Sequence, residues 1–173
     1  MEGWLSVARW IDALTEWVGQ NVKWLVLAAA LISAGNALLR YGFGIGSNAG
    51  LELQWYMFGA IFLLGAGYTL KHGGHVRIDL IVAHLSNRAQ WRIEIFGTLF
   101  FLIPFSLLMV GLSWPMFLAA WKSGEMSPDA GGLPRWPVEL LLPVGFFLLA
   151  LQGVSEIIKN VGRLRGDVTE GPL

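Results

Sequence analysis

The chain has 173 residues, of which 55% are hydrophobic and only 14% are charged, with 12 basic and 12 acidic side chains. Such a low charged fraction, together with long charge-free runs, excludes an ordinary soluble domain and indicates an integral membrane protein. The balanced charge offers no basic surface to a nucleic acid, and the absence of cysteine excludes disulfides, thiolate catalysis and cysteine metal sites.

Residues 1–20 have the pattern of an amphipathic helix. Apolar side chains recur there at spacings of three and four, so one stripe of the helix is apolar, as formed by Trp4, Val7, Ile11, Leu14 and Val18. The sequence Gly19-Gln20-Asn21 then predicts a break. Tryptophans at positions 10, 17 and 24 favour anchoring at the membrane interface over a stripe that binds a partner.

Four later stretches are long and apolar enough to cross a bilayer. They cover residues 22–39, 51–70, 93–120 and 138–158, followed by a polar tail at residues 159–173. The shortest rises about 27 Å as a helix, which is enough to cross the hydrocarbon core. In the third stretch, Pro104 and Pro115 predict a kink or an early exit from the bilayer. We therefore predict an all-α membrane protein, one domain with four transmembrane helices and an N-terminal amphipathic helix.

Local patterns predict how these helices begin and pack. Gly65, Ala66 and Gly67 offer a face that another helix can approach closely. Asn87 and Gln90 have the spacing of a capping box that starts the third helix. Asn36 in the first span and Gln152 in the fourth are expected to hydrogen-bond to a neighbouring helix, and Glu156 precedes Lys159 by three residues on one helical face.

Two connecting segments contain most of the other informative residues. In KHGGHVRIDL, residues 71–80, polar and apolar side chains alternate from His75 onward, so this segment could lie flat on a membrane. The second segment, residues 127–137, has three prolines, which favour an ordered turn with Asp129 and Arg135 free to face a partner. The simpler interpretation, that this segment only joins two spans, stays open.

The distribution of basic residues predicts the orientation. Nine of the 12 lysines and arginines precede the first span, lie between the second and third, or follow the fourth, and three lie in the opposite loops: Arg40, Lys122 and Arg135. Because basic residues concentrate on the cytoplasmic side, both termini and the KHGGHVRIDL segment are predicted to be cytoplasmic.

No catalytic, cofactor or metal site is predicted. The histidines, His72, His75 and His84, fall in one loop without diagnostic metal spacing, and haem ligation would require histidines inside paired spans. Ionisable residues deep in a span would mark an ion or substrate path, and the four spans contain none there. Four spans of this kind suggest a partner or scaffold and not a conduit.

These features resemble a known family, the small membrane subunit of tripartite ATP-independent periplasmic (TRAP) transporters. The resemblance lies in the His75–Leu80 sequence after the second span, in Leu39-Arg40-Tyr41 at the end of the first span, and in Glu52 at the start of the second. The stretches LELQWYMF and SPDAGGLPRWP are similar to the branch assigned to mannitol or chloroaromatic compounds. A tryptophan common before the glutamate in relatives is replaced here by residues 48–50.

The resemblance implies a multi-pass protein of the bacterial inner membrane that pairs with a large permease subunit. That subunit would carry the solute, typically a carboxylate, by a sodium-coupled elevator motion, and a periplasmic binding protein would deliver it. This chain would enlarge the static scaffold. The residues expected to serve structure or interfaces are His75, Arg77, Asp79, Arg40, Glu52, Asp129 and Arg135. Alternatives left open are a stand-alone four-span membrane enzyme, another accessory subunit, and a self-assembling pore.

Overall fold

The structure is a computed structural model that describes residues 2–74 and 85–166. Its elements are α1 (Glu2–Phe43), α2 (Asn48–Lys71), α4 (Asn87–Gly97), the π-helical turn η1 (Thr98–Leu102), α5 (Ile103–Ser123) and α6 (Trp136–Arg165). Four helical stretches are long and apolar enough to cross a membrane, since α4, η1 and α5 form one of them. The all-α, four-span prediction is confirmed.

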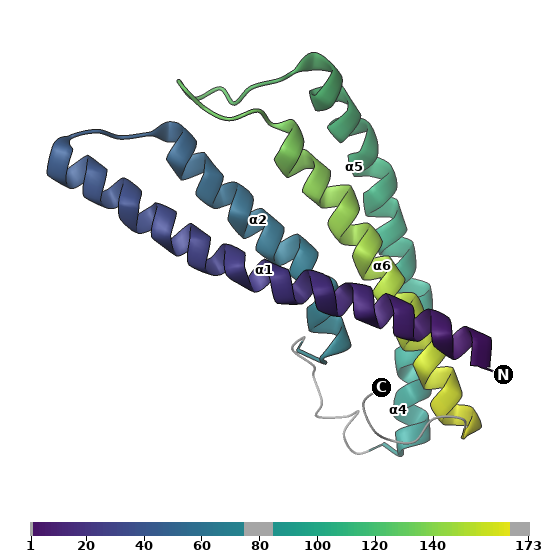
Figure 1. Ribbon diagram of the computed structural model, residues 1–173. Helices are drawn as coiled ribbons and strands as arrows, with labels where there is room; N and C mark the ends of the chain where they lie inside the picture. Colours follow the sequence, from purple (N-terminus) through teal and green to yellow (C-terminus); the bar gives the residue numbers. More distant parts are fainter. Residues whose placement is uncertain (1, 75–84, 167–173) are drawn as a thin grey trace.

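The helices follow one another in space in the order α1, α2, α6 and α5 (Figure 1). Helix α6 contacts all the others: it lies between α2 and α5, the first turns of α1 cross it, and α4 packs beside it. The loop before α2 and the loop between α5 and α6 lie at one end of the bundle, here called the loop end. The start of α1 and the ends of α2 and α6 lie at the other, here called the terminal end.

Helix α1 is continuous, so the break predicted at Gly19-Gln20-Asn21 is wrong. The side chains of Gln20 and Asn21 donate hydrogen bonds back to the preceding turn, to the Glu16 carboxylate at 3.0 Å and the Trp17 carbonyl at 2.7 Å. Gly19 faces the ring of Tyr68 in α2, where a Cβ would collide with the ring. The three residues therefore support the helix and its packing, and the N-terminal helix extends the first span.

The buried face of this N-terminal segment also differs from the predicted apolar stripe. Ala8, Ile11, Asp12 and Thr15 are buried, whereas Val7 is 49% exposed. The buried face is rotated about the helix axis relative to the predicted stripe, because α6 presents polar side chains there and Asp12 faces them. A stripe chosen by hydrophobicity alone does not include such a residue.

The third membrane-crossing stretch is one long helix with a local widening. The cap is Ser86, one residue before the predicted Asn87, so Gln90 falls in the second turn, where its side chain donates to the Leu85 carbonyl at 3.0 Å. The π-helical turn η1 ends at Leu102, two residues before Pro104 in the first turn of α5. Because proline lacks the amide proton that the preceding turn needs, the wider turn absorbs the mismatch.

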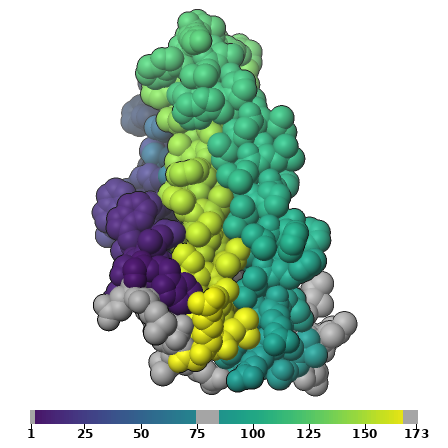
Figure 2. Space-filling view, turned by 90° about the vertical axis from the view of Figure 1, so that its right-hand side faces the viewer, coloured from purple at the N-terminus to yellow at the C-terminus, as the bar shows by residue number. Residues whose placement is uncertain are grey.

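Large apolar side chains point outward over most of the molecule. The buried apolar residues are mainly alanines, whereas Phe62 is 79% exposed and Leu38 is 72% exposed. Figure 2 shows α6 between the start of α1 and the α4–α5 helix, with the loop between α5 and α6 at the far end. An apolar exterior is what a protein surrounded by lipid presents.

Candidate functional site

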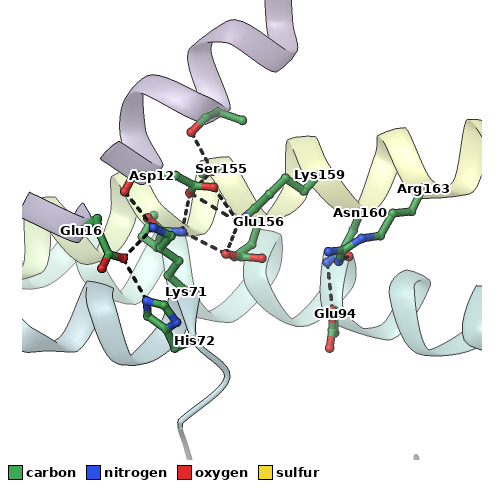
Figure 3. A network of polar contacts seen from close by, with 12 residues as sticks. Asp12, Glu16, Lys71, His72, Glu94, Ser155, Glu156, Lys159, Asn160 and Arg163 are labelled. Atoms are coloured by element: carbon green, nitrogen blue, oxygen red, sulfur yellow. Dashed lines mark hydrogen bonds and ion pairs between the residues drawn. The ribbon is translucent and has the colours of Figure 1, made fainter. Parts of the chain in front are cut away.

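The first polar cluster lies at the terminal end, where α1 crosses α6, and is centred on the buried carboxylate of Asp12 (Figure 3). Ser155 Oγ donates to Asp12 Oδ1 at 2.7 Å, and Gln152 Nε2 donates to the same oxygen at 2.9 Å. Lys159 Nζ lies 3.1 Å from Asp12 Oδ2. Three neighbouring positions of α6 therefore each provide one partner for a single carboxylate of α1.

Lys159 joins two carboxylates. Its ammonium is 2.7 Å from Glu156 Oε1 and shares Asp12 with the hydrogen-bond donors of α6. The side chains of Lys159 and Asp12 are only 7% and 9% exposed. Removing one partner of a buried ion pair leaves an uncompensated charge and costs about 3–5 kcal/mol. The pair therefore determines where the start of α1 can lie.

Helix α2 joins the cluster through its last turn. Lys71 Nζ lies 2.8 Å from Glu16 Oε2 and donates to the Asp12 backbone carbonyl at 3.2 Å. His72 Nε2 lies 3.0 Å from the same Glu16 oxygen. These contacts are more exposed than the Asp12–Lys159 pair, so each contributes less. Together they connect α1, α2 and α6 at one level of the bundle.

Helix α4 is attached to α6 at the same end. Asn160 Nδ2 donates to Glu94 Oε2 at 2.9 Å, and Arg163 donates to Asn160 Oδ1 at 3.0 Å (Figure 3). The sequence correctly predicted that Gln152 bonds to another helix and that Glu156 pairs with Lys159. Polar contacts thus join α1 and α4 to α6 at the terminal end, and α2 is joined to them through α1.

The second polar cluster lies at the loop end and is built around Glu52 in the first turns of α2. Its carboxylate accepts a hydrogen bond from the Leu133 amide at 2.7 Å and another from Ser127 Oγ. Tyr56, one turn later, donates to the Pro134 carbonyl at 3.1 Å. Asn48 donates to the Ala130 carbonyl at 3.0 Å. The first turns of α2 therefore bind the loop between α5 and α6 at several points, from Ser127 to Pro134.

This loop is an ordered turn, as its prolines predicted, but Arg135 is not free. Its guanidinium lies 2.6 Å from Glu125 Oε1 and 3.6 Å from Glu139 Oε1. Its backbone amide also donates to the Glu125 carbonyl, beside an isolated bridge between Met126 and Pro134. The expectation of a free Arg135 was wrong because the loop folds back on itself and uses this charge internally. Asp129 is exposed.

The other expected site residues fall in different places. Arg40 is exposed in the last turn of α1, and Glu52 lies in the first turns of α2, where it binds the loop between α5 and α6. His75, Arg77 and Asp79, like His84, lie outside the described residues. Asp12 and Lys159 were missed. The signal that could have found them is the polar stripe of α6, in which Gln152, Ser155 and Lys159 recur at spacings of three and four and require a polar partner.

The charged side chains belong to the two ends of the helices. Charge is absent from residues 24–39, 53–70, 95–121 and 140–155. The two clusters therefore join helices to one another and to a loop, and a charged path along the spans is missing from the sequence.

Comparison with known proteins identifies the family. Residues 29–163 match the family described as "Tripartite ATP-independent periplasmic transporters, DctQ component". The chain is 29% identical over 145 residues to the C4-dicarboxylate TRAP transporter small permease protein DctQ of Pseudomonas aeruginosa, an alignment that covers 79% of this chain and 68% of that protein. It is 26% identical over 137 residues to the ectoine TRAP transporter small permease protein TeaB of Halomonas elongata, covering 79% and 69%.

No solved structure matches the chain. The matched residues begin in the second half of α1 and extend to the last turn of α6, so they include α2, α4, η1, α5 and the Glu52 cluster, whereas Asp12 and Glu16 of the first cluster precede them. The resemblance to the family seen in the sequence is thereby confirmed, while its finer assignment to the mannitol or chloroaromatic branch stays a prediction: the chain belongs to the family of small permease components of tripartite ATP-independent periplasmic transporters of the inner membrane.

Proposed function

We propose that this chain is the static scaffold subunit of a sodium-coupled, binding-protein-dependent secondary transporter. It pairs with a large permease subunit that moves the solute, and a periplasmic binding protein delivers the solute to the complex. The observation that carries the proposal is the separation of charge from the spans: the two polar clusters lie toward the two ends of the bundle, and the apolar stretches between them, residues 24–39, 53–70, 95–121 and 140–155, carry no charge.

A subunit that moves a solute with an ion needs groups to hold them near the middle of the membrane. Such sites use ionisable side chains or the exposed backbone of broken helices. Here α6 continues through Pro143 without interruption, and η1 passes directly into α5 at Pro104. The continuity of these two helices favours a scaffold role for this chain and a transport site in the large subunit.

The connections between helices support a static role. The Asp12 cluster joins α1, α2 and α6, and the Glu52 cluster joins α2 to the loop between α5 and α6. Both ends of the bundle are thus held by polar contacts, while glycine contacts bring α2 and α6 close together between them. A bundle fixed at both ends suits a surface against which a moving domain slides.

We place the terminal end in the cytoplasm. Nine of the 12 basic residues belong to that side of the chain, and basic residues concentrate on the cytoplasmic side of inner-membrane proteins. The loop between α5 and α6 then lies in the periplasm with Asp129 exposed toward the binding protein. This orientation connects the ordered loop to solute delivery.

The solute is an organic acid or a related small molecule. The printed names of the two relatives refer to C4-dicarboxylate and to ectoine, and the sequence of this chain resembles the mannitol or chloroaromatic branch. Because the proposed scaffold has no solute site, specificity belongs to the large subunit and the binding protein. The chain itself is not an enzyme in this proposal.

Copurification tests the proposal. The tagged chain is coexpressed with a candidate large permease subunit and a candidate periplasmic binding protein from the same organism, extracted in mild detergent, and captured through its tag. We expect the untagged large subunit to copurify at a fixed ratio and to be lost from a Gly145→Val variant, whose α2–α6 packing is disrupted. If the folded chain purifies without the large subunit in every detergent tested, the proposed partnership is contradicted.

A further inference from the structure

The first twenty residues of α1 have two chemically reasonable positions. Helix α1 has 42 residues and is about 63 Å long, roughly twice the hydrocarbon thickness of a bilayer. Its first half therefore has to leave the hydrocarbon region. In the structure this half continues straight and crosses α6 (Figure 1).

The alternative position is along the membrane surface. Trp10 and Trp17 are 65% and 67% exposed on the side of α1 opposite Asp12, so they could enter the lipid interface. Asp12 and Glu16 would then face water. The sequence Gly19-Gln20-Asn21 would provide the bend, because glycine in a helix is costly and Gln20 and Asn21 compete for backbone bonds.

Contacts with α6 oppose that alternative. Asp12 reaches Lys159, Ser155 and Gln152 and is buried by them. The Ser155 hydroxyl lies 3.3 Å from the Ala8 carbonyl, and the Arg165 guanidinium is 5.7 Å from the Trp4 ring centroid. A buried pair of this kind is a poor source of stability compared with apolar packing, and its best-attested use is to select one arrangement among several.

We propose that Asp12 is a positioning residue: its pair with Lys159 holds the start of α1 straight across α6, and loss of the pair lets this segment bend at residues 19–21 onto the membrane surface. The proposal extends the scaffold role, because it names what fixes the angle of the first helix. Its test measures geometry, so the result does not depend on whether the chain transports or binds a large subunit.

The absence of cysteine makes a distance measurement straightforward. Spin labels are attached to cysteines at Val7 and Tyr41, which are exposed on α1, in the full chain in lipid nanodiscs, and pulsed electron paramagnetic resonance gives the distance. A straight helix places the two backbone positions about 51 Å apart, whereas a right-angle bend at residue 20 places them about 37 Å apart.

When Asp12 and Lys159 are both unaltered, we expect a single population near the longer distance between the labels. In Lys159→Met we expect this distance to shift toward the shorter value. Asp12→Asn, which keeps a polar side chain for Ser155 and Gln152, should shift part of the population. Lys159→Arg, which keeps the positive charge, should retain the long distance between the labels. Lys122→Met is the matched control, because Lys122 is exposed at the opposite end of the molecule.

Helicity measured by circular dichroism shows whether each variant is folded. Should Lys159→Met fail to fold, Asp12→Asn decides the matter with its milder change. The proposal is overturned when folded Lys159→Met or folded Asp12→Asn retains the full long-distance population. It is also overturned when Lys122→Met shortens the distance as much as Lys159→Met does.

Discussion

Gly145 of α6 lies directly against Leu63 of α2, with no room for a side chain between the two helices. A Cβ atom built on Gly145 would be 2.7 Å from the Leu63 Cβ and 2.9 Å from its carbonyl oxygen. The obstacle includes backbone, which cannot move aside as the end of a flexible side chain can. A Cβ on Gly153 would lie 2.8 Å from the Leu102 side chain in η1, whereas one on Gly67 would make ordinary contacts at 3.5 Å or more and Gly65 faces open space.

Gly145→Ala should therefore separate α2 from α6. Overpacking of this kind costs about 1–3 kcal/mol, which exceeds the gain in helix propensity from replacing glycine by alanine. The expected result is a lower midpoint of thermal unfolding, measured by fluorescence-detected size exclusion in detergent. Gly111→Ala is the control, because a Cβ at Gly111 meets nothing within 4 Å and should leave the midpoint unchanged or raise it. Equal midpoints for the two variants would show that the helices tolerate the added methyl group.

Glu52→Ala should loosen the loop between α5 and α6. The carboxylate accepts the Leu133 amide proton at 2.7 Å, and a hydrogen bond to a charged group contributes about 1.5–3 kcal/mol. We expect the Leu133 amide to exchange its proton for deuterium at least about tenfold faster, since 1.4 kcal/mol corresponds to a factor of ten. The measurement is hydrogen exchange with mass spectrometry, with Lys122→Ala as control. An unaltered exchange rate in Glu52→Ala would mean that the other contacts of the loop hold it in place without Glu52.

Arg77 and Asp79 lie outside the described residues, and their role stays a prediction from the sequence. Two residues apart, they share a side in an extended segment and can pair, which at a surface contributes about 1 kcal/mol or less. Arg77→Ala and Asp79→Ala are expected to reduce the yield of the complex with the large subunit and to leave substrate preference unchanged. Yield is measured by copurification and preference by competition uptake. A normal yield from both single variants would remove the assembly role.

Asp129→Arg tests whether the loop receives the binding protein. The structure directs the test to Asp129, because a change at Arg135 would break its contacts with Glu125 and Glu139. A docking role predicts slower initial uptake at low binding-protein concentration and partial recovery at high concentration, since a weakened encounter follows mass action. Liposomes containing both membrane subunits give these rates. Superimposable curves for Asp129→Arg and the unaltered chain would leave the loop as a connector.

The sequence predicted the architecture well because membrane burial imposes a simple rule. Uninterrupted apolar runs give the four spans, and the prolines of the loop between α5 and α6 predict its ordered shape. It predicted the break near Gly19 wrongly. Turn propensity is a local property, whereas the helix continues there because Gly19 packs on Tyr68 and Asp12 is held by α6.

The polar cluster at the terminal end was the harder part. Asp12 and Lys159 are separated by 147 residues, and each belongs to a helix end that by itself looks solvated. Their pairing depends on the angle at which α1 crosses α6, which no local pattern contains. Arg135 shows the same limit: the loop had to fold back before its guanidinium could meet Glu125.

The central claim is that this chain supports transport without performing it, and reconstitution tests it most directly. Liposomes contain the chain alone, the large subunit alone, or both, and receive a sodium gradient and the cognate binding protein loaded with its radiolabelled solute. The account predicts sodium-dependent uptake when both subunits are present and none above empty liposomes with this chain alone. Sodium-dependent uptake by liposomes that contain only this chain would contradict it.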